Sequence, residues 1–268
     1  MKHSKRTFIT GLTLTILGLT TFSNTICAAE TLTAGKLSIG MEMTYPPFES
    51  YEGDKVVGFD PDMAVLLGKQ IGAEVNYVET KFSGLMLGLN ANKYDIVISG
   101  IYVTPERQKK AYVIPYARTG AAIMVGKGSK YQPRTEKDLC GMTVGLQQGT
   151  TWVTALNKLS DSYCKEQGKG EIRVRAFPSA PEVSQALMSK NIEAQVEISG
   201  AAKIIVKKSK GRIEISSEDL IYPQTLGIYV NKNNPALKDS LQQAFDTINS
   251  NGSFPDLLEK YELNSVTQ

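Results

Sequence analysis

Arg107 lies where backbone and side-chain donors could together bind an anion. It follows a short apolar run that predicts a strand ending at Ser99. Thr104 is a good N-cap and Pro105 suits the first helical position, so a helix is predicted to begin there. Arg107 would then lie in the first helical turn, where unpaired backbone N–H groups and a planar guanidinium together favour a carboxylate.

The elements that must position Arg107 alternate between strand and helix along the chain. Such alternation argues for mainly parallel sheets with helices on both faces, so the predicted fold class is α/β. We expect Asp60 to be the N-cap of the first long helix, with Pro61 as its first residue, and Asn234 to be the N-cap of the last. The predicted strands are 36–42, 75–78, 95–99, 143–146, 194–198 and 227–230, and short or long helices are predicted at 84–89, 200–206 and 235–248.

Residues 1–29 have the composition of a secretory signal. A basic start precedes an apolar stretch that is too short and too mixed for a membrane span. Cleavage is expected after Ala29, which would leave an exported, periplasmic protein. Lipid attachment at Cys27 is the less favoured alternative, because Ile26 stands where such attachment usually needs a small residue.

Removal of the signal also changes the charge balance. Three of the 30 basic residues and none of the 27 acidic residues lie in it, so 27 of each remain. A formally neutral chain disfavours a nucleic-acid partner. The only histidine, His3, also lies in the signal, so no histidine remains for a catalytic triad or a zinc site, and we expect no metal and no cofactor.

Two motifs resemble those of a known family. The segment around Arg107 reads S-G-x-x-x-T-P-E-R followed by V-I-P-Y, and residues 58–64 read G-F-D-x-D-x-A. Both are similar to signatures of the bacterial polar amino-acid-binding proteins, the solute-binding family 3 of ABC importers, and the resemblance covers nearly all of the chain after residue 30. It implies a two-lobed periplasmic-binding-protein fold of type II with a two-stranded hinge. Lobe 1 would comprise 30–119 and 224–268, and lobe 2 would comprise 120–223.

The resemblance implies that Arg107 binds the α-carboxylate of a ligand. Backbone N–H groups of Tyr102 and Thr151 would add donors, with Gly149 in the turn before the helix of lobe 2. The family usually has Ser or Thr where Tyr102 stands, so only the backbone contact is expected here. Gly100 is also a candidate binding residue.

The resemblance also places residues around the side chain of the ligand. Tyr45 and Phe82 match positions that commonly sandwich it, and aromatic faces attract cations. Glu42 ends the first strand, where its carboxylate could pair with a cationic side chain. This favours arginine, lysine or a related cation, although relatives that bind neutral polar amino acids can also carry an acid here. Gln147 and Trp152 would border the same pocket, while Trp152 could equally be lobe packing.

The group that binds the α-amino group is left open. The usual acid of the family falls in register on Ile198, and Glu197 stands one residue earlier. A shift of one residue in a strand turns the side chain to the opposite face. Either a bulge turns Glu197 into the pocket, or Ser99, backbone carbonyls and water hold the amino group.

The two remaining cysteines, Cys140 and Cys164, are expected to form a disulfide, because export places them in an oxidising compartment. A minority of the family is similar in having L-C-G before the second-lobe strand and a cysteine about two dozen residues later. Two free buried thiols are the alternative.

The resemblance implies a monomeric receptor that binds an amino acid between its lobes and delivers it to a membrane permease. The alternatives are an enzyme on the same fold, such as a cyclohexadienyl dehydratase, and a receptor that signals without transport. Glu42 and Glu197 are the only acids offered to the cleft, and the charge of the ligand accounts for Glu42. We therefore expect no enzyme.

Overall fold

In the computed structural model, which describes residue 1 and residues 30–265, the chain is organised around a ten-stranded mixed sheet. Apart from Met1, the predicted signal lies outside the described residues. The strand order is β5 (Glu74–Glu79), β1 (Lys36–Met41), β6 (Ile96–Val97), β12 (Ile221–Asn231), β7 (Ala111–Gly126), β10 (Ala194–Ile198), β8 (Thr143–Gln147) and β9 (Arg173–Phe177). β11 (Ile213–Ile215) and β13 (Asn264–Ser265) pair with β7, and a separate sheet contains β2 (Thr44–Tyr45), β3 (Glu49–Glu52) and β4 (Lys55–Val57).

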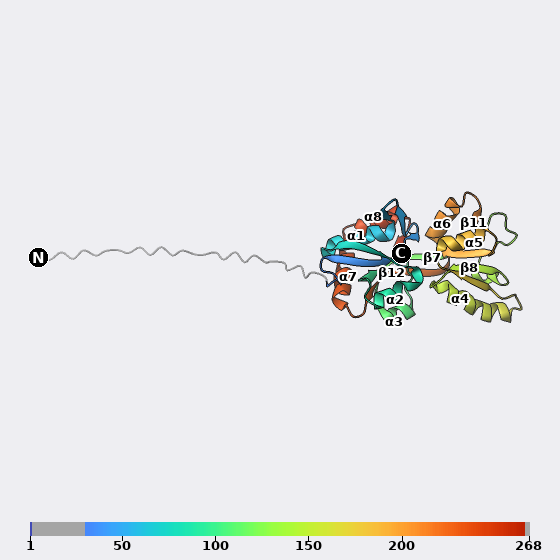
Figure 1. The fold of residues 1–268 in the computed structure, drawn as a ribbon, viewed down its shortest axis with the longest axis horizontal. Helices are drawn as coiled ribbons and strands as arrows, with labels where there is room; N and C mark the ends of the chain where they lie inside the picture. Colours follow the sequence, from blue (N-terminus) through green and yellow to red (C-terminus); the bar gives the residue numbers. More distant parts are fainter. Residues whose placement is uncertain (2–29, 266–268) are drawn as a thin grey trace.

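Two long antiparallel strands, β7 and β12, join the two halves of the molecule (Figure 1). They pair from Ala111 opposite Asn231 to Ala121 opposite Ile221, with register shifts on the way. β12 also pairs with β6, whereas the last part of β7 pairs with β10 and β11. Away from this pair the strands are parallel, with β5, β1 and β6 on one side and β10, β8 and β9 on the other. The predicted two-lobed α/β fold is confirmed.

The helices gather in two groups, one on each side of the β7 and β12 pair (Figure 1). Met63, Leu67 and Ile71 lie buried on one face of the first long helix, as the apolar spacing of that segment predicts. The first group contains α1 (Phe59–Ile71), α2 (Leu85–Asn90), α3 (Pro105–Lys110), α7 (Pro235–Ser250) and α8 (Ser253–Lys260), and the second contains α4 (Thr151–Leu159), α5 (Ala180–Met188) and α6 (Ser199–Lys208).

The prediction of Asp60 as an N-cap is wrong. The N-cap of α1 is Gly58, whose φ of 134° favours glycine, and a Cβ there would come within 2.2 Å of the carbonyl oxygen of Phe48. Asp60 instead lies inside the first turn and is fully buried. Its carboxylate accepts hydrogen bonds from the Gly100 N–H and the Tyr116 hydroxyl. Tertiary partners therefore take the side chain that the sequence pattern assigned to a local cap.

The other two predicted caps are confirmed. Thr104 caps α3, where its hydroxyl oxygen accepts the backbone N–H of Arg107 at 3.2 Å. Asn234 caps α7, where its side-chain oxygen accepts the backbone N–H of Leu237 at 3.0 Å. Both helices also begin with proline, which fixes the start of each helix to one residue.

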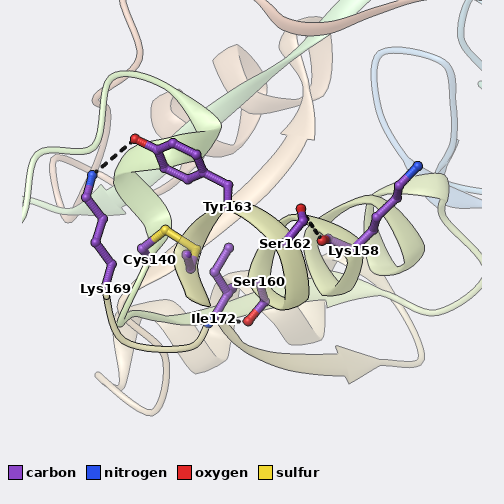
Figure 2. Close-up of a disulfide and its surroundings, with 8 residues drawn as sticks. Cys140, Lys158, Ser160, Ser162, Tyr163, Lys169 and Ile172 are labelled. Carbon is purple, nitrogen blue, oxygen red and sulfur yellow. Dashed lines mark hydrogen bonds between the residues drawn. A yellow bond between two sulfur atoms is a disulfide. The ribbon is translucent and has the colours of Figure 1, made fainter. Parts of the chain in front are cut away.

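A disulfide joins Cys140 to Cys164, as predicted (Figure 2). Cys164 ends a π-helical turn, Ser160–Cys164, that continues α4. The hydroxyl of Ser160 accepts the N–H of Ile172 at 2.9 Å and so ties this turn to the segment that leads into β9. Because the bond closes a loop with a sequence separation of 24, chain entropy predicts a stabilisation of about 3 kcal/mol.

No helix in the described part of the chain is long and apolar enough to cross a membrane. The largest buried apolar cluster contains residues from both groups of helices and from both connecting strands. The core therefore continues through the connection between the lobes.

Candidate ligand-binding site

Arg107 contacts both lobes. Its guanidinium donates to the carbonyl oxygen of Tyr102 at 2.7 Å and to that of Gly149 at 3.0 Å. The guanidinium carbon also lies 5.8 Å from the centre of the Phe82 ring, within the range of cation–π attraction. Burial lowers the pKa of Arg107, but an arginine stays protonated at neutral pH. The predicted carboxylate-binding residue is thus a partly buried cation between the lobes.

The backbone of Tyr102 faces away from β12. Tyr102 and Leu226 form an isolated antiparallel bridge. The neighbouring residues make the hydrogen bonds of this bridge, from Val103 N–H to Thr225 and from Gly227 N–H to the carbonyl of residue 101. In such a non-hydrogen-bonded pair the N–H and C=O of Tyr102 point away from the partner strand. The N–H of Tyr102 is therefore not used in pairing with β12, which the predicted carboxylate contact requires.

The turn at Gly149 brings lobe 2 against lobe 1. Gly149 has a φ of +83°, and a Cβ on it would lie 2.8 Å from the Cα of Ser83. Only glycine fits this conformation and this close approach without a shift of one of the two chains. α4 starts two residues later at Thr151, which lines a cavity between the lobes together with Thr150. The helix N-terminus and Arg107 thus reach the same cavity.

Glu42 and Gln147 join the lobes at a second point. The side-chain amide of Gln147 donates to the carboxylate of Glu42, which also accepts from the Thr44 hydroxyl at 3.2 Å. Glu42 is buried, and this burial raises its pKa, while the hydrogen bonds from Gln147 and Thr44 lower it. Sequence reasoning did not single out Thr44, whose role follows only from the position of the small sheet.

The aromatic side chains occupy different places. Tyr45 and Phe82, which we predict to sandwich the ligand, line the cavity from lobe 1, and Tyr45 stacks on Phe48 with ring centroids 5.7 Å apart. Trp152 also lines the cavity and meets the Tyr102 ring edge to face at 5.6 Å. The Tyr102 hydroxyl and the Trp152 indole N–H have no hydrogen-bond partner within the described residues. Trp152 therefore packs between the lobes and also presents a donor.

β10 has no bulge that would turn Glu197 into the cavity. β10 pairs with β7 in an unbroken register from Ala194 opposite Val125 to Ile198 opposite Ala121, so the bulge that we considered is absent there. Ile198 lines the cavity, and Glu197 does not. Glu197 is nevertheless 1% exposed, and neither carboxyl oxygen has a hydrogen-bond partner in the described part of the chain.

Ser99 and Gly100 are held by two acids, Glu49 and Asp60, whose contacts sequence reasoning did not predict. The Ser99 hydroxyl accepts the N–H of Glu42 at 3.0 Å and donates to the carboxyl of Glu49 at 2.7 Å. The N–H of Gly100 donates to Asp60 at 2.6 Å. Burial raises the pKa of Glu49 well above its usual range, and the neighbouring Asp60 carboxylate raises it further. The Ser99 hydroxyl already donates to Glu49 and accepts from Glu42, so one lone pair of its oxygen is left for a ligand.

The cavity between the lobes is narrow in this conformation. Its free volume is about 10 Å³, the space of about one water molecule. The arrangement places a cation and a helix N-terminus at one part of the cavity and the Glu42 carboxylate at another part of the interface. No group of acidic, histidine or cysteine side chains suited to a metal ion was found among the residues of 30–265. The site is suited to a small dipolar ligand, provided that the lobes part to admit it.

The fold and the site together define a two-lobed small-molecule-binding protein. The family model described as bacterial extracellular solute-binding proteins, family 3, matches residues 37–264. The chain belongs to this family, as the resemblance of its motifs predicts.

The chain is similar to proteins named for several amino acids. It is 30% identical to the L-cystine-binding protein TcyJ of Escherichia coli (strain K12) over 87% of this chain and 85% of that protein. It is also 30% identical to ABC transporter arginine-binding protein 1 of the same strain, over 85% of this chain and 91% of that protein. Among solved structures, an ancestral arginine-binding protein bound to arginine is 31% identical with a TM-score of 0.77, over 85% of this chain and 98% of that chain.

Proposed function

We propose that this protein is a periplasmic receptor that binds a cationic amino acid between its lobes and delivers it to the permease of an ABC importer. The observation that carries the proposal is the placement of Arg107 and the α4 N-terminus at one cavity, with the Glu42 carboxylate at the same interface. The first two groups suit the carboxylate of an amino acid, and Glu42 suits a cation on its side chain.

The same contacts suggest how a ligand would be exchanged. Arg107 donates to Gly149 and Glu42 accepts from Gln147 across the interface, so the groups that would bind the ligand already bind each other. A ligand carboxylate would replace the carbonyl oxygens at Arg107 and form the stronger, charge-assisted pair. We assign residues 30–119 and 224–268 to lobe 1 and residues 120–223 to lobe 2, with the hinge in β7 and β12, and we expect a monomer.

The relatives support transport more than catalysis. The similar proteins are named as binding proteins for cystine, arginine or histidine, and the family is described by its binding of solutes. A dehydratase or a sensory receptor would share the fold, since fold alone does not decide function. Among amino acids, arginine is favoured over cystine because Glu42 provides a carboxylate for a side-chain cation.

A panel of thermal melts tests the proposal. The purified protein is unfolded and refolded to remove bound amino acid, then melted with about 1 mM arginine, lysine, cystine, glutamine or glutamate. A ligand with a dissociation constant near 1 μM should stabilise the protein by about 4 kcal/mol. For a chain of this length this is a rise in Tm of about 8 to 16 °C with arginine or lysine, and little change with glutamate. If no amino acid raises the Tm, the assignment is wrong.

A further inference from the structure

Glu197 is buried by the opposite lobe. It lies near the end of β10 in lobe 2, where β7 places Ala122 opposite it. The titratable groups that face it, Glu42, Tyr45 and Tyr102, all come from lobe 1. The Tyr45 hydroxyl also accepts the N–H of Ile198 at 3.4 Å, which fixes it at this end of the strand. Glu197 therefore lies at the contact between the two lobes, beside Ile198, which lines the cavity.

In this conformation Glu197 has little compensation for a negative charge. Neither carboxyl oxygen has a hydrogen-bond partner of normal geometry, and no cation is among the groups that face it in the described chain. Burial raises the pKa of Glu197 to about 8, the Tyr45 hydroxyl offsets part of this rise, and the Glu42 carboxylate adds to it. The carboxyl is therefore mostly protonated at pH 7 in this conformation.

We propose that Glu197 binds a cationic nitrogen of the ligand and releases its proton to the solvent when it does. The proposal rests on the proposed function and adds proton release to that site. In the exchange, the O–H bond of the carboxyl breaks, the proton passes to a buffer base, and the carboxylate pairs with an ammonium or guanidinium group. A cation on the ligand would neutralise the charge of the buried carboxylate. A neutral or anionic ligand group would leave Glu197 protonated.

The number of protons released can be measured by titration calorimetry in buffers of different ionisation enthalpy. With arginine at pH 7, the slope of the binding enthalpy against the buffer enthalpy should give about 0.9 proton released per ligand. Arginine binding should also be about fiftyfold tighter at pH 8 than at pH 6, because the proton competes with the cation. 5-Guanidinopentanoate, which lacks only the α-ammonium of arginine, and citrulline, which lacks the side-chain cation, show which nitrogen displaces the proton.

Matched glutamine variants make the test specific. Glu197→Gln resembles the protonated side chain, so it should fold, bind arginine more weakly and release no proton. Glu193→Gln, just before the same strand, removes a carboxylate that bonds to the N–H of Thr143 outside the cavity, and should release as many protons as the unchanged protein. Arginine binding without proton release, or release that persists in Glu197→Gln, overturns this inference and leaves the proposed function intact. A failure of every amino acid to bind overturns both.

Discussion

Arg107 is the residue on which ligand affinity should depend most, because it makes polar contacts in both lobes. Removal of one partner of a buried charged pair typically costs about 2 to 4 kcal/mol, so Arg107→Ala should weaken arginine binding by about 30- to 1000-fold. Arg107→Lys keeps the charge but loses the planar fork, and should still weaken binding by about tenfold or more.

Lys109→Ala, on the exposed side of the same helix, is the control for Arg107. Calorimetry at pH 7.5 should give it an affinity within about twofold of the unchanged protein. An equally large loss in Lys109→Ala would mean that α3 contributes through its structure and not through the guanidinium.

The stability of the ligand-free protein should fall as the pH rises past the ordinary pKa of a glutamate. The folded protein keeps the proton of Glu197 up to a pKa of about 8, whereas the unfolded chain releases it near 4.5. Between these values the folded state binds one more proton, so the free energy of unfolding falls by about 1.4 kcal/mol per pH unit. In Glu197→Gln this pH-dependent contribution to the free energy of unfolding is absent.

Urea unfolding of both proteins at pH 5.5, 6.5 and 7.5 measures the difference. The unchanged protein should lose about 2.5 kcal/mol more than Glu197→Gln over these two units. Parallel curves for the two proteins would show that Glu197 ionises normally.

The sequence predicted best those site residues whose positions depend on their immediate neighbours in the chain. Arg107 was identified as a candidate binding residue because the residues just before it predict both the strand and the N-cap at Thr104. Asp60 was assigned to a cap, since nothing in the sequence shows that its partners would be Gly100 and the Tyr116 hydroxyl. The absence of a bulge at Glu197 depends on pairing with β7, a distant segment.

Asp60, in the first turn of α1, bonds to the loop that contains Ser99 and Gly100. The stability of the protein should therefore depend on Asp60. Asp60→Asn exchanges a carboxylate that accepts two hydrogen bonds for an amide that must donate on one side. Loss of a charge-assisted, buried bond predicts a destabilisation of about 2 kcal/mol by urea unfolding at pH 7.

Asp62→Asn, on the same helix, is the matched control for Asp60→Asn. Asp62 is partly exposed and accepts from Lys260 and the Tyr261 hydroxyl. Exposed pairs of this kind contribute about 0 to 1 kcal/mol. If the two variants are equally stable, the buried carboxyl pair does not hold the loop.

At the scale of elements, periodicity and caps located most of the strands and long helices. The small sheet of β2 to β4, the helix α8 and the strand β13 were not predicted, because they are short and are held by pairing or packing with distant segments. β7 is a single strand of 16 residues that runs from one lobe into the other, a continuity that the sequence alone could not distinguish from two strands.

For the whole molecule, the resemblance of the motifs predicted the two lobes, but not how tightly they close. The contact between Gly149 and Ser83, and the bonds of Arg107 and Glu42 to lobe 2, depend on the relative position of segments that meet only in the folded protein. The same helices and strands are compatible with two lobes that do not touch, so the elements alone do not predict this contact.

The direct contact of the lobes limits how fast a ligand can enter. A cavity with about 10 Å³ of free volume cannot admit an amino acid, so the interface must open first. The observed association rate should then rise with ligand concentration and level off at the opening rate, on a microsecond to millisecond scale. Trp152, the only tryptophan in the chain, lies at the cavity and would report each event by its fluorescence in stopped-flow mixing.

Gln147→Ala removes one of the bonds between the lobes, so it should raise this plateau even though it weakens binding. A rate that stays proportional to concentration up to millimolar ligand would show that the free protein already stands open. The same plateau would set an upper limit on how often one molecule can be loaded, because further ligand could not speed the opening of its lobes.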